Sequence, residues 1–134
     1  MCGIVGIYYR NGACDQGLLT AMRDSVVHRG PDGAGNYLDG PLGLGHRRLS
    51  IIDLGGGHQP MATEDGRFVL CYNGEIYNYN ELRAELESRG VRFRTHSDTE
   101  VILHLHALDG DGAVLRLNGI FAYALWDKLE RRLL

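Results

Sequence analysis

The sequence predicts an α+β fold in which helices pack on the outer faces of antiparallel sheets. Its 134 residues are enough for about one domain, and 44% of them are hydrophobic, so a sizeable core can form. The expected elements follow the order strands, helix, strands, helices, strand. This order lacks the regular strand–helix alternation of a doubly wound parallel sheet, so mixed layers with antiparallel sheets fit better.

The first half of the chain is expected to hold three strands and one helix. Residues 3–9 are nearly all apolar, which indicates a strand buried on both faces. Asp15 is a candidate N-cap for the helix that follows. The apolar positions of this helix, at helical spacing, are Leu19, Met22 and Val26. The turn-rich run 29–33 cannot continue the helix, and short strands are expected at 35–38 and 42–52.

Two further strands are expected in the second half. Residues 67–72 and 120–126 are rich in apolar and aromatic residues. Asn73-Gly74 follows the first strand and is a strong turn signal, since both residues tolerate positive φ. After the second strand, residues 131–134 read as the start of a partner strand. A strand this short pairs poorly, so we expect the chain to be a fragment of a longer protein.

Two helices begin at capping-box patterns, residues 78–81 (NYNE) and residues 97–100 (SDTE). Glycines at 90 and 110 are expected to end them. The expected buried face of the first helix consists of Tyr79, Leu82 and Leu86. The expected buried face of the second helix consists of Val101, Leu105 and Leu108.

The composition argues against several classes of function. A net charge of −3 gives no basic surface for nucleic acid or an acidic membrane. No apolar run approaches the roughly 20 residues that span a bilayer, and no signal peptide precedes Cys2. The three cysteines, Cys2, Cys14 and Cys71, lack the CxxC spacing of a zinc site and are odd in number for a disulfide framework. We therefore expect a cytoplasmic protein with reduced thiols.

Cys2 is the most informative residue of the chain. If Met1 is removed, Cys2 carries a thiol and a free α-amine together. A free thiol has a pKa of about 8.5, and an α-amine titrates at about 7.7–8.0, so the amine can act as the base for its own side chain. Gly3 and Gly6 would let a substrate approach the backbone. The alternative is that Cys2 simply begins a buried strand.

Cys2 is accompanied by four motifs, which are 28–33 (HRGPDG), 46–53 (HRRLSIID), 73–78 (NGEIYN) and 97–101 (SDTEV). Together they resemble the N-terminal glutaminase domain of class II glutamine amidotransferases, the N-terminal-nucleophile type. Within that group, the RGPDG and RLSIID runs and residues 57–61 (GHQPM) are most similar to glutamine-hydrolysing asparagine synthetases. The resemblance covers residues 2–134. It implies a four-layer αββα N-terminal-nucleophile hydrolase fold, incomplete at its C-terminal end.

The same resemblance implies hydrolysis of glutamine to glutamate and ammonia. Cys2 would be the nucleophile and would form a γ-glutamyl thioester. The Asn73 side-chain amide and the Gly74 N–H would stabilise the oxyanion, a contribution of about 2.7–4 kcal/mol for one such donor. Arg48 would pair with the substrate carboxylate through two parallel hydrogen bonds, and Asp98 would take the ammonium. The other residues of the glutamine pocket would be Leu49, Ser50, Ile51, Ile52 and Glu75.

Simpler interpretations exist for some of these residues. Asn73-Gly74 alone favours a plain hairpin turn. Asp98 alone favours a helix-start residue that satisfies backbone N–H groups. His46 is the candidate base of a Cys–His dyad if the α-amine does not serve. Strand alternation places Arg47 on the opposite face from the carboxylate-binding arginine, and we expect Arg47 to be solvated.

Metal and nucleotide sites are not predicted. His104 and His106 are two apart on an expected helix and face different ways. Glu100 and His104 can share a face, but two ligands do not make a site. The glycine runs at 30–35 and 55–57 lack the Gly-Lys-Ser/Thr ending of a phosphate-binding loop.

The resemblance also implies partners for this domain. In the asparagine synthetase branch, ammonia passes to a C-terminal synthetase domain that activates aspartate with ATP and Mg²⁺. We expect no cofactor in the present chain, and a homodimer is compatible with the resemblance. Two other functions stay open, which are the glutaminase domain of a different biosynthetic amidotransferase and a non-catalytic fragment that binds a partner.

Overall fold

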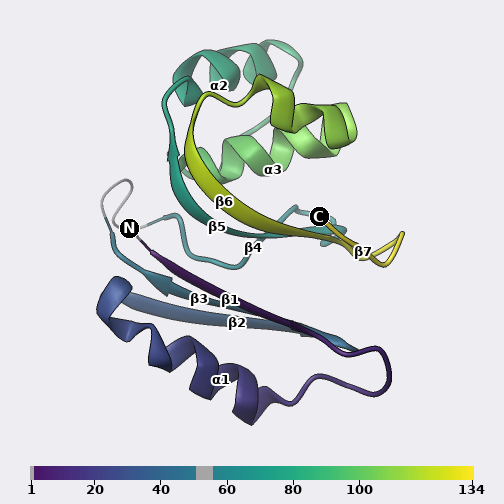
Figure 1. Cartoon of the computed structure of the whole chain (residues 1–134). Coiled ribbons are helices and arrows are strands. Elements are labelled where there is room, and N and C mark those ends of the chain that lie inside the picture. Colours follow the sequence, from purple (N-terminus) through teal and green to yellow (C-terminus); the bar gives the residue numbers. More distant parts are fainter. Residues whose placement is uncertain (1, 51–55) are drawn as a thin grey trace.

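A computed structural model describes residues 2–50 and 56–134 of the chain. These residues form four layers, in which two stacked sheets lie between helix α1 on one side and helices α2 and α3 on the other (Figure 1). Both sheets are antiparallel throughout. The predicted α+β fold with an αββα layer order is therefore confirmed.

The first sheet has the strand order β1-β3-β2 and the second has the order β4-β5-β6-β7. The strands of the first sheet are β1 (Gly3–Tyr8), β2 (Gly33–Asp39) and β3 (Leu42–Arg48). The strands of the second sheet are β4 (Met61–Ala62), β5 (Phe68–Ile76), β6 (Gly119–Asp127) and β7 (Arg132–Leu133). The α-helices are α1 (Gln16–Ser25), α2 (Tyr79–Ser88) and α3 (Asp98–Asp109). Short 3-10 helices follow α1 and α3, namely η1 (Val27–Arg29) and η2 (Gly110–Arg116).

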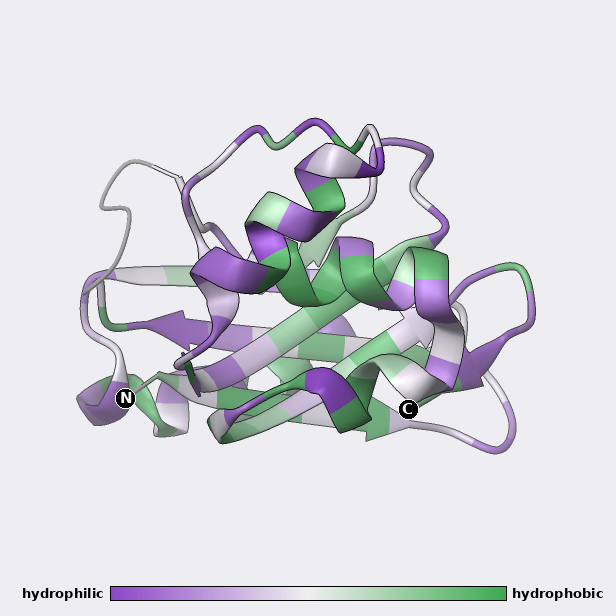
Figure 2. Cartoon of the chain, turned by 90° about the horizontal axis from the view of Figure 1, so that it is seen from above, coloured by the Kyte–Doolittle hydropathy of each residue, from purple (hydrophilic) through white to green (hydrophobic). Residues whose placement is uncertain are grey.

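Among the described residues, two hydrophobic clusters fill the space between the sheets and the space between the second sheet and its helices. The core between the sheets is built from Leu42, Leu44, Val69, Cys71 and Trp126. The core between the second sheet and its helices includes Leu70, Tyr72, Leu86, Val101 and Leu125. Adjacent residues of β5 enter different cores, because side chains alternate across a strand. Figure 2 shows α3 as the more hydrophobic of the two helices over the second sheet, in keeping with its deeper burial.

Trp126 joins the two sheets at the end distant from the pocket. Its indole Nε1 donates a 2.8 Å hydrogen bond to Oδ2 of Asp39, the last residue of β2. The Trp126 side chain is fully buried, so this bond satisfies a polar group that water does not reach. The contact fixes one sheet against the other.

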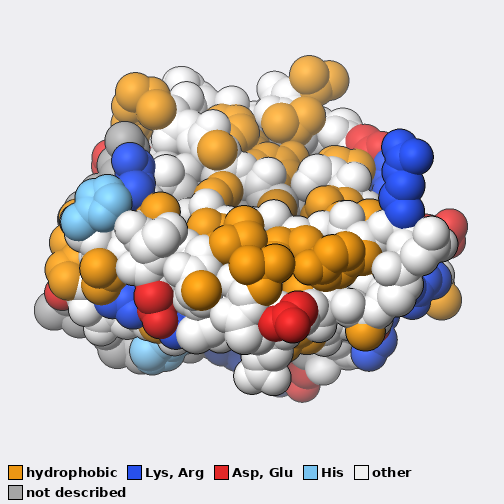
Figure 3. Space-filling view, turned by 60° about the horizontal axis from the view of Figure 1, so that its bottom comes forward, with side chains coloured by type: hydrophobic (Ala, Val, Ile, Leu, Met, Phe, Trp, Pro, Cys, Tyr) orange, Lys and Arg blue, Asp and Glu red, His pale blue; other side chains and the backbone are white. Residues whose placement is uncertain are grey.

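Exposed hydrophobic side chains are visible on the face of the molecule that Figure 3 shows. Leu18 in α1 and Val27 just after it are both among the exposed large hydrophobic residues. Apolar atoms make up much of any protein surface, and scattered exposure of this kind is ordinary. In the part of the chain that is described, no helix is long and apolar enough to cross a membrane.

The expected turn at Asn73-Gly74 is wrong, because β5 continues through both residues to Ile76. Asn73 pairs with Ala122 and Gly74 with Phe121 in the ladder to β6. The glycine serves a close approach between strands. A Cβ atom at position 74 would lie 2.3 Å from the carbonyl oxygen of Ile120. Long-range pairing with β6 therefore overrides the local turn signal.

Two other strand expectations need correction. The strand expected at 42–52 ends at Arg48, and residues 51 and 52 lie outside the described part. The first strand was expected to be buried on both faces, but Tyr8 is half-exposed. The reason is that β1 is an edge strand of its sheet. The short strand β4 was not predicted.

The helix caps agree with the sequence only in part. Ser97 caps α3 as expected, because its hydroxyl accepts a hydrogen bond from the Thr99 N–H. Asn78 makes no cap hydrogen bond at α2. Its side chain instead donates to the carbonyl of Arg116 and accepts from the N–H of Asn118.

The expected buried face of α3 is also corrected, because Leu108 is half-exposed near the helix end. Tyr79, Leu82 and Leu86 of α2 do face the core.

Candidate active site

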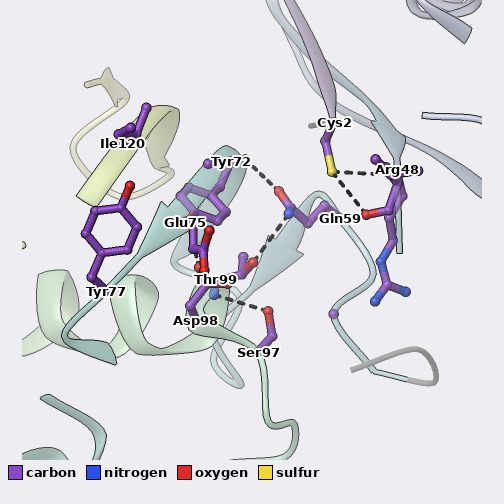
Figure 4. Close-up of a pocket in the computed structure, with 13 residues that line it drawn as sticks. Cys2, Arg48, Gln59, Tyr72, Glu75, Tyr77, Ser97, Asp98, Thr99 and Ile120 are labelled. Atoms are coloured by element: carbon purple, nitrogen blue, oxygen red, sulfur yellow. Dashed lines mark hydrogen bonds between the residues drawn. The ribbon is translucent and has the colours of Figure 1, made fainter. Parts of the chain in front are cut away.

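A cavity of about 200 Å³ opens where β1, β3, β5 and the start of α3 meet (Figure 4). Segments from both sheets and from the loop before β4 form its wall. The lining residues are Cys2, Arg48, Leu49, Gly57, Gln59, Tyr72, Gly74, Glu75, Tyr77, Ser97, Asp98, Thr99 and Ile120. The cavity thus collects the thiol, one arginine and two carboxylates that the sequence singled out.

Cys2 is half-buried at one end of the cavity. Its Sγ accepts a hydrogen bond from the Leu49 N–H at 3.3 Å and lies 3.7 Å from the Leu49 carbonyl oxygen. The backbone carbonyl of Cys2 accepts a hydrogen bond from Nε of Arg29 at 3.1 Å. Gly3 leaves room for the end of α1, since a Cβ there would lie 2.8 Å from Val26 Cγ2. The Leu49 backbone therefore contacts the thiol, and Arg29 holds the backbone of Cys2.

Arg48 is the last residue of β3 and is only 7% exposed. Gly57 packs against it, because a Cβ atom at position 57 would lie 2.9 Å from Nη2 of Arg48. Arg47 points to the opposite side, as strand alternation predicts. It is not solvated as expected, since its Nε donates to the Gly30 carbonyl and its Nη1 lies 3.6 Å from Asp24.

Asp98 opens α3 and is 5% exposed. Its Oδ2 accepts hydrogen bonds from the Tyr72 hydroxyl at 2.6 Å and from the Ile76 N–H at 3.2 Å. Both donors belong to β5 and not to the helix itself. Ser97, one residue earlier, is the residue that caps α3. The simpler interpretation of Asp98 as a helix cap therefore does not describe its contacts.

Gly74 and Glu75 of β5 both line the cavity. Asn73 is not among the lining residues, and its buried side-chain Oδ1 has no hydrogen-bond partner among the described residues. The atom without a partner is the amide oxygen, which accepts hydrogen bonds and does not donate them. The structure thus brings the Asn73-Gly74 segment beside the cavity, with Gly74 at its wall.

Of the remaining residues predicted for the glutamine pocket, one lines the cavity, one lies outside its lining, and two are not described. Leu49 lines the cavity and contacts the thiol. Ser50 is held outside the lining, where its N–H donates a 2.8 Å hydrogen bond to Oδ2 of Asp32. Ile51 and Ile52 lie outside the described residues.

His46 does not have the contacts of a base for Cys2. Its Nε2 lies 3.1 Å from the carbonyl oxygen of Tyr72, so this nitrogen carries the proton and donates. Burial lowers the pKa of His46 to about 4, and the nearby Arg48 acts in the same direction. The neutral, buried ring of His46 donates its proton to the Tyr72 carbonyl of β5, so its role is to link strands.

Gln59, Tyr72 and Thr99 line the cavity but were not predicted as site residues. The side chain of Gln59 accepts a hydrogen bond from the Tyr72 N–H and donates to Thr99 Oγ1 at 3.3 Å. It therefore links β5 to the start of α3 across the cavity wall (Figure 4). The only sequence signal for Gln59 was its place in the 57–61 motif, and nothing local indicated Tyr72.

The carboxylate of Glu100 has a structural role. It accepts hydrogen bonds from the N–H groups of Arg94 and Thr95 and from the Thr95 hydroxyl. Burial opposes its ionisation, but these donors hold the pKa of Glu100 below its usual range. His104 lies 3.4 Å away. Within residues 2–50 and 56–134, no group of three His, Cys, Asp or Glu side chains could hold a metal ion.

A family model described as a glutamine amidotransferase domain matches residues 1–134. The chain therefore belongs to the glutamine amidotransferase domain family. Its fold is that of the N-terminal-nucleophile hydrolases. This assignment confirms the resemblance on which the site residues were chosen.

Among known proteins, the chain is similar to glutamine-hydrolysing asparagine synthetases. It is 45% identical over 132 residues to asparagine synthetase [glutamine-hydrolyzing] 1 of Bacillus subtilis, covering 96% of the chain and 21% of that protein. It is 42% identical over 132 residues to asparagine synthetase [glutamine-hydrolyzing] 1 of Arabidopsis thaliana, covering 95% of the chain and 22% of that protein. The chain thus spans about a fifth of the length of these curated relatives.

A solved structure shows the same fold. Glutamine phosphoribosylpyrophosphate amidotransferase from B. subtilis, complexed with ADP and GMP, superimposes with a TM-score of 0.75 at 23% sequence identity. The match covers 92% of the present chain and 35% of that structure. The four-layer arrangement is therefore shared with a protein of low sequence identity.

Proposed function

We propose that this domain hydrolyses glutamine to glutamate and ammonia, with Cys2 as the nucleophile. The observation that carries the proposal is the position of the Cys2 thiol at one end of a cavity that Arg48, Gly74 and Asp98 also line. Glutamine needs a nucleophile at its side-chain amide, a donor for the developing oxyanion, a cation for its α-carboxylate and an anion for its α-ammonium. The thiol, the Gly74 N–H, Arg48 and Asp98 are groups of these four kinds. The membership of the chain in the glutamine amidotransferase family supports the same reaction.

The reaction begins when the Cys2 sulfur attacks the side-chain amide carbon of glutamine. A C–S bond forms, and the carbonyl oxygen takes the negative charge of a tetrahedral intermediate. The C–N bond then breaks, and the nitrogen leaves as ammonia with the proton that the thiol lost. Water attacks the resulting thioester, which releases glutamate and returns the proton to sulfur.

The oxyanion needs donors that are already in place before the attack. We assign this role to the Gly74 N–H at the cavity wall and to the side-chain amide of Asn73. Asn73 precedes Gly74 in β5, and the amide nitrogen of its side chain is a donor of the kind that this role requires.

The ends of the substrate are recognised by charge. Arg48 is buried and ends β3 beside Gly57, where its guanidinium suits the α-carboxylate of glutamine. Asp98 suits the α-ammonium, and Glu75 adds a second carboxylate at the wall. We also include Leu49, whose backbone contacts the thiol.

The base that takes the thiol proton is the α-amine of Cys2 after removal of Met1. His46, the alternative candidate, is committed to the Tyr72 carbonyl and has a pKa of about 4 because it is buried. A histidine in that state binds a proton too weakly to serve as the base near neutral pH.

The ammonia passes to a synthetase domain of a longer natural protein, which makes asparagine from aspartate with ATP and Mg²⁺. The asparagine synthetases to which the chain is 45% and 42% identical are about five times as long, which supports such an arrangement. The cytoplasm, where aspartate and ATP meet, is the proposed location.

The test is the intact mass of the purified protein before and after 6-diazo-5-oxo-norleucine, a glutamine analogue that alkylates such thiols. Removal of Met1 and one adduct at Cys2 are expected, together with glutamate and ammonia release from glutamine. Cys2→Ala should lose the adduct and the activity. Cys14→Ala is the matched control and should keep both, because Cys14 lies outside the cavity lining. Full glutaminase activity in the Cys2→Ala variant would contradict the mechanism.

A further inference from the structure

Tyr72 is joined to three other parts of the fold at once. Its hydroxyl donates to Oδ2 of Asp98 at 2.6 Å. Its backbone N–H donates to the side chain of Gln59, and its carbonyl accepts from Nε2 of His46 at 3.1 Å. The loop before β4, strand β3 and helix α3 therefore all meet at this one residue of β5.

These contacts leave the Tyr72 hydroxyl little freedom. The residue is 3% exposed, and its backbone is held on both sides by side chains. Burial and the adjoining Asp98 raise the pKa of the Tyr72 phenol, so the hydroxyl stays protonated and can only donate to the carboxylate. Asp98 thus has a fixed donor that carries no charge.

The choice of a neutral donor has a consequence for Asp98. A buried carboxylate needs hydrogen-bond donors to replace the water that burial removes. An arginine or lysine would supply them but would also cancel the negative charge. Tyr72 and the Ile76 N–H both bind Oδ2 and leave the charge in place. Among the described residues, no donor contacts Oδ1, so this oxygen remains for a cationic group in the cavity.

We propose that Tyr72 is a positioning residue that gives the site its specificity for substrates with an α-ammonium group. It acts through Asp98, whose carboxylate it orients so that the free oxygen faces the ammonium of glutamine. The inference rests on the proposed glutaminase function. The inference adds Tyr72 to the site as an uncharged residue that does not react. Loss of its hydroxyl is expected to affect only the recognition of the α-ammonium end of glutamine.

The experiment compares Tyr72→Phe with the unaltered intact protein on two substrates, glutamine and 4-carbamoylbutanoate, which is glutamine with hydrogen in place of the α-amino group. The preference for glutamine, as the ratio of the two kcat/KM values, is expected to fall about tenfold in Tyr72→Phe. The loss should lie in KM for glutamine, with kcat nearly unchanged. Tyr123→Phe is the matched control, because Tyr123 is the cross-strand partner of Tyr72 in β6.

A second measurement does not require turnover. The rate of Cys2 alkylation by 6-diazo-5-oxo-norleucine, which has an α-amino group, should fall in Tyr72→Phe. The rate with iodoacetamide, which has none, should stay the same. If Tyr72→Phe fails to fold, Tyr72→Met fills the same space with a flexible apolar side chain and is measured in its place.

Asp98→Asn provides the internal check. Tyr72 is proposed to act only through Asp98, so Tyr72→Phe should have no further effect on the substrate preference in an Asp98→Asn background. An unchanged preference in Tyr72→Phe would overturn the inference, and so would equal effects on both alkylating agents. These outcomes differ from failure of the proposed function, in which the unaltered protein itself would neither hydrolyse glutamine nor be alkylated at Cys2.

Discussion

The Nε–H of Arg29 donates a hydrogen bond of 3.1 Å to the backbone carbonyl oxygen of Cys2. Arg29 is the last residue of η1, the 3-10 turn that follows α1. The contact thus ties the end of the outer helix layer to Cys2, the proposed nucleophile. Because the bond reaches the backbone of Cys2 and not its sulfur, it fixes position without altering the thiol.

Arg29→Ala should lower kcat for glutamine hydrolysis about tenfold or more, because a charged donor to Cys2 is lost. KM should change less, since the substrate contacts lie elsewhere. Steady-state ammonia release measures both constants. Arg92→Ala is the control, because Arg92 is exposed in the loop before α3. Equal kcat values for the Arg29→Ala and Arg92→Ala variants would exclude the positioning role of Arg29.

Gly74→Ala should damage both stability and activity. The added Cβ would lie 2.3 Å from the Ile120 carbonyl oxygen and 2.6 Å from Phe121 Cα, so β5 and β6 must separate. Backbone displacement of this kind costs about 1–3 kcal/mol in the free energy of unfolding. Gly112→Ala is the control, because nothing lies within 4 Å of a Cβ there. Urea denaturation of both variants makes the comparison, and a fully stable Gly74→Ala would refute the steric argument.

Asp39→Ala should weaken the attachment between the two sheets. The buried Nε1 of Trp126 would lose its acceptor, which typically costs about 1–3 kcal/mol in the free energy of unfolding. Asp111→Ala is the control, since it removes a solvent-exposed ion pair with Arg132 and such pairs contribute little. If denaturant titration shows the same loss of unfolding free energy for both variants, the Trp126 hydrogen bond contributes no more than an exposed ion pair.

The stability of the domain should depend on pH through His46. The pKa of His46 is about 4 in the folded chain because the ring is buried, and about 6.5 when the chain is unfolded. Between these values the unfolded chain binds a proton that the folded chain excludes. The free energy of unfolding should therefore fall as pH drops from 6.5 to 4, by up to about 3 kcal/mol.

His46→Gln keeps a side-chain N–H that can donate to the Tyr72 carbonyl but cannot titrate. The pH dependence over this window should become shallower in His46→Gln, as measured by urea denaturation at pH 4.5 and 7.5. His28→Gln, at an exposed position, should leave the slope unchanged. A slope in His46→Gln as steep as in the unaltered protein would assign the acid sensitivity to other groups.

Local signals predicted the elements well where local interactions decide them. Ser97 caps α3 as expected, and Leu82 and Leu86 form the buried face of α2. The signals failed where a distant partner competes. The turn at Asn73-Gly74 gave way to pairing with β6, and the side chain of Asn78 is taken by the η2 region instead of the cap.

The candidate site divides in the same way. Cys2, Arg48 and Asp98 could be chosen from motifs, because their charge and reactivity are visible in the sequence. Gln59 and Tyr72 could not, since an uncharged side chain gains its role only from the groups that the fold brings to it. Tyr72 holds Asp98 in place, and Gln59 in turn holds the backbone of Tyr72.

The thiol of Cys2 contacts the backbone of Leu49, 47 positions along the chain, and the other lining residues extend from Arg48 to Ile120. A ribosome therefore makes the nucleophile first and the residues that give it a substrate last. Until α3 has been synthesised and docked, the cysteine is an ordinary thiol without a glutamine pocket. With the proposed mechanism, ammonia release therefore requires a folded domain.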